Sequence, residues 1–446
     1  MGIRSWISMA LQVSVATALL VGCSQPSATP EANSPASGSG SEQSGQTVKL
    51  KMVESITSPQ RTEMLKGMLA KFEEKNPGIK VDLISPPFEG ADQKITQMLM
   101  AKEELDVLEV REFNAKQFSM NGFIENLKPY TDKWQNYDQL TDVAKRRATW
   151  VDNTPYYIPN GLYQRVLYYR TDWFKEAGIE VPKTWDELLV AGKKLTDPAK
   201  NRFGYSFRGG STGWDYALIT MWAYNGPQVD PASAFFLKDG RTLFSTPESL
   251  EAMRYYKQLY KEASPADSVS WGFQEMVQGF VAGSTAMLIQ DPDVIDGAKE
   301  KMQEGTWATA PIPVGPSGVA QQVVGGPGWG MTAYSKHKEE AWKLIKFLSD
   351  PEQATHFAKK TSVIPVVKSA AEDEFYKTGY FKPFIEMNQQ PATFLDVSRP
   401  VDYKGWGAWQ STADKEIQSY LLDQLSAEDL LKKWDQYWTK EKAERK

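Results

Sequence analysis

The chain is poor in residues that cross-link or bind metals: among 446 residues it has one cysteine, Cys23, and two histidines, His337 and His356. One cysteine cannot form an internal disulfide, a Cys-x-x-Cys redox pair or a cysteine-rich zinc site. Two histidines exclude a multi-histidine metal centre. The sequence also lacks a Gly-x-Ser-x-Gly elbow, a phosphate-binding Walker loop and a His-Glu-x-x-His pair. The motifs of several common enzyme classes are therefore missing, and we expect no cofactor.

Charge of neither sign dominates. Lys and Arg number 51 against 56 Asp and Glu, a formal net charge of −5. Nucleic-acid-binding proteins usually show a basic face and a high pI, so we expect no nucleic-acid partner. The mean hydropathy of −0.48 excludes a polytopic membrane protein. Aromatic residues, in contrast, are plentiful, with 15 Trp, 19 Tyr and 19 Phe, and some of them are candidates for a binding surface.

Residues 1–22 have the features of an export signal. Arg4 precedes a mostly apolar stretch over 7–21 that is too short and too mixed for a transmembrane helix. The stretch ends in Leu-Val-Gly-Cys at Cys23, which resembles the lipobox of bacterial lipoproteins. We expect a signal peptide over 1–22, a lipid on Cys23 and an extracytoplasmic protein anchored to the cell membrane. An ordinary secretory peptide with an incidental cysteine is the alternative.

The segment after the signal, 23–47, is dominated by Ser, Pro, Gly and other residues that cannot bury apolar surface. It predicts a disordered tether between the lipidated Cys23 and a folded body. At 446 residues, the chain has room for about two or three domains. No segment as polar as this one recurs, so the body after Val48 is expected to be continuous.

The folded body begins with alternating strand and helix patterns. Apolar and polar residues alternate over 48–53 and again over 79–83, and 106–110 predicts a third strand. Between the first two, Ser58-Pro59 marks a helix start and Asn76-Pro77-Gly78 its end. This β-α-β-α-β order predicts a parallel sheet with right-handed crossovers, and hence an α/β fold.

Further helices are predicted downstream by their first residues. Thr184 and Glu187 form a capping-box pattern, and Thr246-Pro247 predicts another helix start. Apolar residues at helical spacing after Ser335 predict another helix, and Asp350-Pro351 marks the start of the next one. The tail over 408–438 is also predicted to be mostly helical.

Four segments in order are similar to motifs of a known family. The first is 167–179 with 182–188, which contains Leu-Tyr-Tyr and Pro-x-Thr-Trp-x-Glu-Leu. The second is 280–287, with Phe-x-x-Gly-x-x-Ala-Met. The third is the Gly-Gly pair at 325–326 with 335–348, and the fourth is 364–370. The chain resembles the sugar-binding family of extracellular solute-binding proteins of ABC importers, which includes maltose-binding protein. The resemblance covers essentially all of 48–446. Arg170 departs from the pattern, since the family usually has Asn there.

This resemblance implies a two-lobed periplasmic-binding-protein-like fold with discontinuous lobes and a hinge. Matching segments place lobe 1 at 48–160 plus 294–361 and lobe 2 at 161–293 plus 362–446, with crossings near 159–163, 291–296 and 362–365. The implied function is that of a non-enzymatic monomer that captures a sugar or oligosaccharide between the lobes. The implied partner is the membrane permease of an ABC importer, which receives the sugar.

A sugar site needs aromatic rings for the C–H faces and polar side chains for the hydroxyl groups. The candidates that follow strands or lie beside glycines are Glu54, Arg111, Glu112, Tyr163, Trp214, Asp215, Trp271, Asp291, Asp293, Trp329, Trp406 and Trp409. By resemblance, Tyr163 occupies the position of a ligand carboxylate and Trp409 that of a stacking tryptophan. Other tryptophans at helical spacing are expected to serve core or surface packing rather than ligand binding; these are Trp173, Trp185, Trp342, Trp434 and Trp438.

Other interpretations stay open at this point. Arg111 and Glu112 also suit a solvated charge pair. Asp291 and Asp293 lack the spaced glycine and the terminal glutamate of a calcium loop, so we expect no metal there. A secreted carbohydrate-active hydrolase is one alternative function, because paired acids such as Glu109 and Glu112 are what a glycosidase uses. A binding protein for a non-sugar solute such as a polyamine is another.

Overall fold

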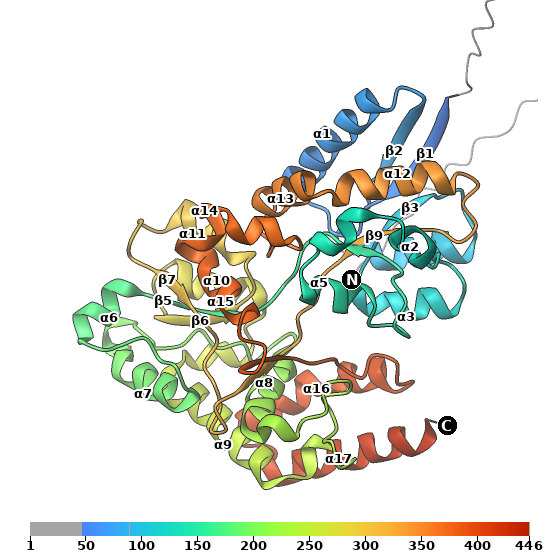
Figure 1. Ribbon diagram of the computed structural model, residues 1–446. Coiled ribbons are helices and arrows are strands. Elements are labelled where there is room, and N and C mark those ends of the chain that lie inside the picture. Colours follow the sequence, from blue (N-terminus) through green and yellow to red (C-terminus); the bar gives the residue numbers. More distant parts are fainter. Residues whose placement is uncertain (1–46, 89, 446) are drawn as a thin grey trace, which may run out of the picture. The chain divides into compact units, whose positions relative to one another are not determined.

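The structure is a computed structural model that describes residues 47–88 and 90–445. The predicted signal peptide, Cys23 and all but the last residue of the predicted tether lie outside these residues. No helix in the described part is both long and apolar enough to cross a membrane. From Val48 onward the chain forms two lobes, each built around a sheet of its own (Figure 1).

Lobe 1 is built on a five-stranded sheet with the order β2-β1-β3-β9-β4. The strands are β1 (Val48–Val53), β2 (Ile79–Ile84), β3 (Val107–Val110), β4 (Ile158–Pro159) and β9 (Gly328–Met331). β1 pairs in parallel with both β2 and β3, and α1 (Pro59–Lys75) and α2 (Ala91–Met100) connect them. The predicted alternation over 48–110 is confirmed. The predicted cap is present too, since Ser58 accepts a hydrogen bond from the backbone N–H of Arg61.

Both faces of this sheet are buried, as is usual where strands are parallel. Along β1, Leu50 and Met52 point into one apolar cluster, and Val53 points into the other. Helices α1 and α12 (Lys338–Ser349) cover the first face (Figure 1). Helices α2 and α3 (Glu112–Met120) supply the apolar side chains of the second.

Lobe 2 is built on an antiparallel sheet with the order β6-β5-β7 and a separate parallel pair, β8 and β10. These strands are β5 (Val166–Tyr169), β6 (Met287–Gln290), β7 (Ala308–Ala310), β8 (Ala320–Gln322) and β10 (Phe394–Asp396). Leu167 of the central strand pairs with Ile289 on one side and Ala310 on the other. The larger helices of this lobe are α7 (Trp185–Leu195), α8 (Gly213–Asn225), α9 (Pro247–Ala263), α16 (Trp406–Leu421) and α17 (Ala427–Glu444).

Short polar side chains start several helices where the sequence predicts them. Thr184 and Glu187 form both hydrogen bonds of the capping box at α7. Thr246 caps α9 by accepting from the N–H of Ser249. A cap of this kind contributes about 1 kcal/mol to stability. The helical tail is also confirmed, as α16 and α17 with a short turn between them, after which Ser426 caps α17.

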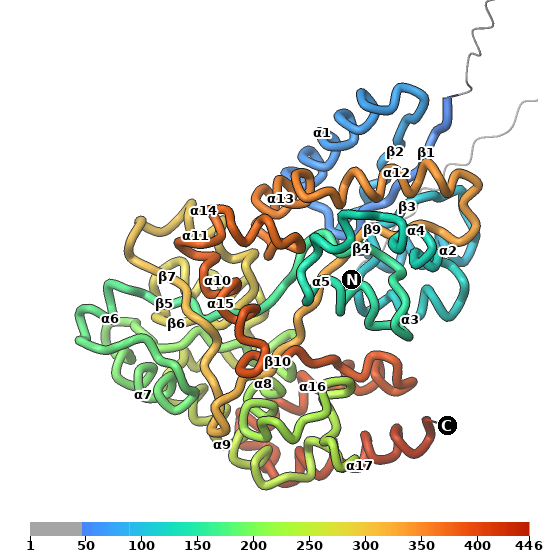
Figure 2. Tube along the Cα trace, in the orientation of Figure 1, coloured from blue at the N-terminus to red at the C-terminus, as the bar shows by residue number. Residues whose placement is uncertain are grey.

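The chain passes between the lobes three times, and the passes are hydrogen-bonded to one another (Figure 2). They comprise residues 160–163, 323–327 and 362–364. Tyr163 and Gly325 exchange backbone hydrogen bonds with N···O distances of 2.8 and 3.1 Å. Leu162 and Ile364 do the same at 3.0 and 3.1 Å. A connection limited to a few paired residues is the kind of element that absorbs a hinge motion.

The second pass does not lie where the sequence suggested. We predicted a crossing near 291–296 and a return to lobe 1 at residue 294, but β7 pairs with β5 inside lobe 2. Asp291-Pro292-Asp293 interrupts the strand pattern because it turns the chain from β6 into α11 (Val294–Lys301). Residues 294–322 therefore belong to lobe 2, and the chain returns to lobe 1 through 323–327.

Candidate functional site

Two adjoining cavities lie where the lobes meet beside the chain passes. The smaller, of about 190 Å³, we call the polar chamber, and the larger, of about 530 Å³, the tryptophan chamber. The polar chamber is lined by Glu112, Tyr163, Arg165, Ile219, Trp222, Asp291, Gln322, Val323, Gly325 and Arg399. The tryptophan chamber is lined by Phe113, Asn114, Gln117, Arg165, Thr212, Trp214, Asp215, Arg399, Val401, Trp406 and Gln410. Arg165 and Arg399 line both, so the two spaces share a wall of guanidinium groups.

Asp215, in the first turn of α8, holds the two arginines of this wall. Its carboxylate accepts a hydrogen bond from Nη2 of Arg165 at 2.8 Å. It also accepts a forked pair from Nε and Nη2 of Arg399 at 2.9 and 2.8 Å. Burial raises the pKa of Asp215, but the two guanidinium groups outweigh it and hold that pKa below the ordinary 3.8. Asp215 is thus an anion at neutral pH, and it fixes the orientation of both cations.

Three more carboxylates belong to the surroundings of the polar chamber. Glu112 comes from lobe 1, as the first residue of α3, whereas Asp291 and Asp293 come from lobe 2, just after β6. Burial and the nearby Asp215 raise the pKa of Asp291, although Arg165, with its Nε 4.0 Å away, opposes this. The surrounding protein and the charge of Asp291 raise the pKa of Asp293 to about 7. The chamber therefore offers acceptors from both lobes for donor groups of a polar solute.

The tryptophan chamber adds aromatic surface to these polar groups. Trp214 and Trp406 both line it, with ring centroids 5.6 Å apart in an edge-to-face arrangement. Arg399 lies over Trp214, with its guanidinium carbon 5.8 Å from the ring centroid. Trp406 is only half-buried, so part of its ring stays open to the chamber. Aromatic faces beside fixed donors and acceptors suit a molecule with both C–H and hydroxyl surface.

Trp409 does not face either chamber, contrary to the prediction. It is 2% exposed and packs among Trp214, Phe235 and Trp434, whose ring centroids lie 5.2, 4.9 and 5.2 Å away. Trp406, three residues earlier, starts α16 at the chamber, whereas Trp409 faces the helix interface inside lobe 2. The chamber position thus belongs to Trp406, and Trp409 is a core residue.

Two other predicted tryptophans, Trp329 and Trp271, are not among the lining residues of the chambers. Trp329 lies in β9 between β3 and β4, is 1% exposed and contacts Phe357 at 5.7 Å between ring centroids. The surrounding glycines make room for neighbouring backbone in the sheet, and no solute reaches the indole. Trp271 covers Gly279, where a Cβ atom would lie 2.8 Å from the indole, and it lines neither chamber.

Glu54 and Arg111 are occupied inside lobe 1. Glu54 is fully buried and accepts hydrogen bonds from Thr62 and Ser85, both at 2.6 Å. It shares Arg61 with the buried Glu109, an ion-pair cluster at the ends of β1 and β3. Arg111 pairs with Asp92 at 2.8 Å and lines neither chamber. Charged residues after strands were correctly placed at this edge of the sheet, but these two serve to hold the lobe together.

The remaining predicted residues come together at the chambers. Glu112, Tyr163 and Asp291 line the polar chamber, and Trp214, Asp215 and Trp406 line the other. Asp293 follows two residues after Asp291 but does not line the chamber itself. The prediction missed every other polar lining residue of the two chambers, which are Asn114, Gln117, Arg165, Thr212, Gln322, Arg399 and Gln410. Arg165 was within reach of sequence reasoning, since it lies two residues after Tyr163, whereas the segment around Arg399 has no periodic pattern.

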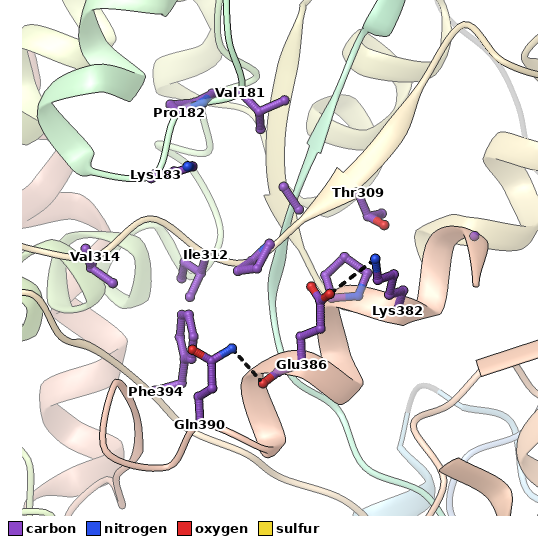
Figure 3. Close-up of a pocket in the computed structure, with 14 residues that line it drawn as sticks. Val181, Pro182, Lys183, Thr309, Ile312, Val314, Lys382, Glu386, Gln390 and Phe394 are labelled. Atoms are coloured by element: carbon purple, nitrogen blue, oxygen red, sulfur yellow. Dashed lines mark hydrogen bonds and ion pairs between the residues drawn. The ribbon is translucent and has the colours of Figure 1, made fainter. Parts of the chain in front are cut away.

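A third cavity, of about 450 Å³, lies on lobe 2 away from the chambers (Figure 3). It is a mostly apolar groove beside β7, with Ile312 and Phe394 among its lining residues. Its polar groups largely satisfy one another: Lys382 lies 3.4 Å from Glu386, and Gln390 donates to the Glu386 backbone carbonyl at 3.3 Å. We regard the chambers rather than this groove as the functional site, because they bring fixed charges and aromatic rings together from both lobes.

The pair Trp406 and Trp409 gives a direct test of this assignment. We expect Trp409→Ala to lower the free energy of unfolding by about 3–5 kcal/mol, because it leaves a large cavity in the core. Trp406→Ala should cause a clearly smaller loss, since part of that ring is already in solvent. Urea unfolding followed by circular dichroism measures both. Equal losses for the two variants would contradict the placement of Trp406 at the chamber.

Comparison with known proteins places this geometry in a family. A putative binding protein of Brucella abortus is 29% identical over 315 residues, covering 68% of this chain and 73% of its own length. Maltose-bound MalE3 of T. maritima superposes with a TM-score of 0.73 at 24% identity, covering 88% of this chain and 99% of that chain. A ribitol complex of an ABC transporter solute-binding protein from Agrobacterium radiobacter gives 0.71 at 21% identity, covering 89% and 99%.

The fold is thus the α/β periplasmic-binding-protein fold that the sequence predicts. The sequence profile of the bacterial extracellular solute-binding proteins matches residues 58–355, which span parts of both lobes and two of the three passes. This family consists of binding proteins, and the hydrolase alternative has no support from it. The chain belongs to the bacterial extracellular solute-binding protein family.

Proposed function

We propose that this protein captures a sugar or a sugar alcohol in the two chambers and delivers it to the permease of an ABC importer. The observation that carries the proposal is the shared wall of Arg165 and Arg399, fixed by Asp215, with carboxylates on one side and tryptophans on the other. Maltose and ribitol, the ligands of the two solved structures above, belong to the same polyhydroxy class.

The chemistry of the walls fits such ligands. Each hydroxyl group both donates and accepts a hydrogen bond, so it needs acceptors such as Glu112 and Asp291 and donors such as Arg399. The C–H faces of a ring or a carbon chain pack on aromatic rings, which Trp406 and Trp214 supply. Because Asp215 already orients the guanidinium groups, little ordering remains to be done when the solute binds.

Capture is proposed to involve a hinge motion. Lobe 1 contributes Glu112 and Phe113 to the chambers, and lobe 2 contributes Trp214, Asp291 and Trp406. A solute that touches both sets binds better when the lobes are close together, and it shifts the population toward that state by its differential affinity. The three chain passes are the hinge in this proposal, with the lobe boundaries as corrected above. The closed form is then what the permease recognises.

The test is a ligand screen by thermal unfolding and small-angle scattering. Maltose, ribitol, erythritol and D-mannitol are compared, with spermidine as the probe for the polyamine alternative. A binding sugar or polyol at a hundred times its dissociation constant should add about 2.7 kcal/mol to the stability of the folded protein. The radius of gyration should fall on saturation. A shift with spermidine alone would replace the sugar proposal with the polyamine one.

Two variants locate the binding. Trp406→Ala should weaken binding about ten- to hundredfold, because a stacking surface is lost. Phe394→Ala, in the apolar groove of Figure 3, is the matched aromatic control and should bind as the wild type does. If Phe394→Ala loses binding and Trp406→Ala keeps it, the chambers are not the site.

We also propose that the protein works at the outer face of the cell membrane as a lipoprotein monomer. The support is the lipobox-like segment that ends at Cys23 and the polar segment that follows it. A lipid chain on Cys23 would hold the protein by burying its CH₂ groups in the bilayer, with the polar segment as a flexible tether.

Cys23→Ser tests the anchor. We expect the wild type to partition with membranes and the variant to be released or to remain unprocessed, because serine cannot receive the thioether-linked lipid. Membrane fractionation and intact-mass measurement of both proteins decide the matter. Equal membrane partitioning, with no lipid mass on the wild type, would contradict the proposal.

A further inference from the structure

Gly325 lies in the second chain pass and lines the polar chamber next to Glu112. A methyl group at position 325 would lie 3.1 Å from Cδ of Glu112 and closer still to its Oε1. The backbone of Gly325 is at the same time paired in both directions with Tyr163 of the first pass. One residue of the hinge is therefore in contact with a chamber carboxylate of lobe 1.

The Glu112 side chain lines the chamber with its carboxylate close to position 325. Within residues 47–88 and 90–445, no hydrogen bond or ion pair engages its carboxylate, although it lines the chamber. Arg147 is nearby but is already paired with Asp396. Burial lowers the pKa of Arg147, but Asp396, Tyr157 and Glu112 outweigh it and raise that pKa above its ordinary value. Because residue 325 has no side chain, the Glu112 carboxylate can occupy its present position.

We propose that Gly325 is a positioning residue for solute binding: its lack of a side chain lets the Glu112 carboxylate lie against the second chain pass and face the polar chamber. This rests on the proposed function. Glu112 is the lobe 1 acceptor for ligand hydroxyl groups, and Gly325 sets where that acceptor stands. The Glu112 carboxylate, which accepts hydrogen bonds from the ligand in this proposal, then also contacts the hinge.

Other glycines of the passes have a different role. A methyl group at Gly326 would overlap the backbone carbonyl of Gly161, and one at Gly161 would lie 2.9 Å from Cβ of Val363. Those overlaps involve backbone or a core side chain, so substitution there damages the connection between the lobes. At Gly325 the overlap is with the far end of a flexible side chain, which can move away with little loss of folding stability.

The test uses isothermal titration with maltose and with D-mannitol, together with thermal unfolding of each unliganded variant. Gly325→Ala should bind about ten- to hundredfold more weakly, because it displaces a charged hydrogen-bond acceptor. Its melting temperature should stay near that of the wild type. Gly67→Ala on α1, where a methyl group meets nothing within 4 Å, is the glycine control and should bind normally.

A double-mutant cycle separates this role from a merely structural one. In a Glu112→Ala background, Gly325→Ala should cause no further loss of affinity, since the group that it displaces is gone. Glu112→Asp combined with Gly325→Ala should recover part of the affinity, because the shorter side chain clears the added methyl group. Both results are expected if Gly325 acts only through Glu112.

Two outcomes would overturn the assignment. Additive losses in the double variant, with no rescue by Glu112→Asp, would mean that Gly325 acts through the backbone of the hinge. Unchanged affinity of Gly325→Ala would mean that the Glu112 position does not matter for binding. A wild-type protein that saturates with none of maltose, ribitol, erythritol and D-mannitol would instead contradict the proposed sugar and polyol function, on which this assignment rests.

Discussion

The buried carboxylate of Asp215 is the interaction on which the rest of the site depends. It binds Arg165, just before β5, and Arg399, in the segment after β10, and so joins three parts of lobe 2 that are far apart in the chain. A buried charge without its partner is strongly destabilising, so the three side chains must be placed together or not at all. Because the two guanidinium groups form the wall between the chambers, this one carboxylate gives both chambers their shape and charge.

The second constraint is the narrow connection between the lobes. Three short passes pair through Tyr163, Gly325, Leu162 and Ile364, close to the chamber walls. Tyr163 and Gly325 belong to the hinge and to the polar chamber at once. In the proposed mechanism, a solute in the chamber contacts residues of the same passes that change conformation when the lobes move. This gives ligand binding and hinge motion a common physical basis, in addition to the contacts that each lobe makes with the solute.

Local patterns in the sequence were sufficient to predict several elements of both lobes. The alternation over 48–53 and the cap at Ser58 in lobe 1, and the capping box at Thr184 in lobe 2, are set by neighbours within a few residues, and all are present. Side-chain orientation was harder to predict. Trp406 and Trp409 lie on one helix three residues apart, and only the packing of Trp409 against Phe235 and Trp434 decides which one is in the core.

Long-range partners could not be read from the sequence at all. Asp215 and Arg399 are 184 residues apart, and nothing local indicates that they meet. The same holds for the second pass: segments matched to the family placed it near 291–296, whereas the chain there runs from β6 into α11 and stays in lobe 2. The candidates that line the chambers follow strands or start helices, where chain direction alone brings side chains to the meeting edge of the lobes.

The most direct test of the account is a crystal structure of the protein grown with whichever of maltose or D-mannitol gives saturable binding. The account predicts ligand density in the polar chamber, with hydroxyl groups within hydrogen-bonding distance of Glu112 from lobe 1 and Arg399 from lobe 2, and with carbon atoms against Trp406. Density confined to the apolar groove beside β7, or contacts with one lobe only, would contradict it.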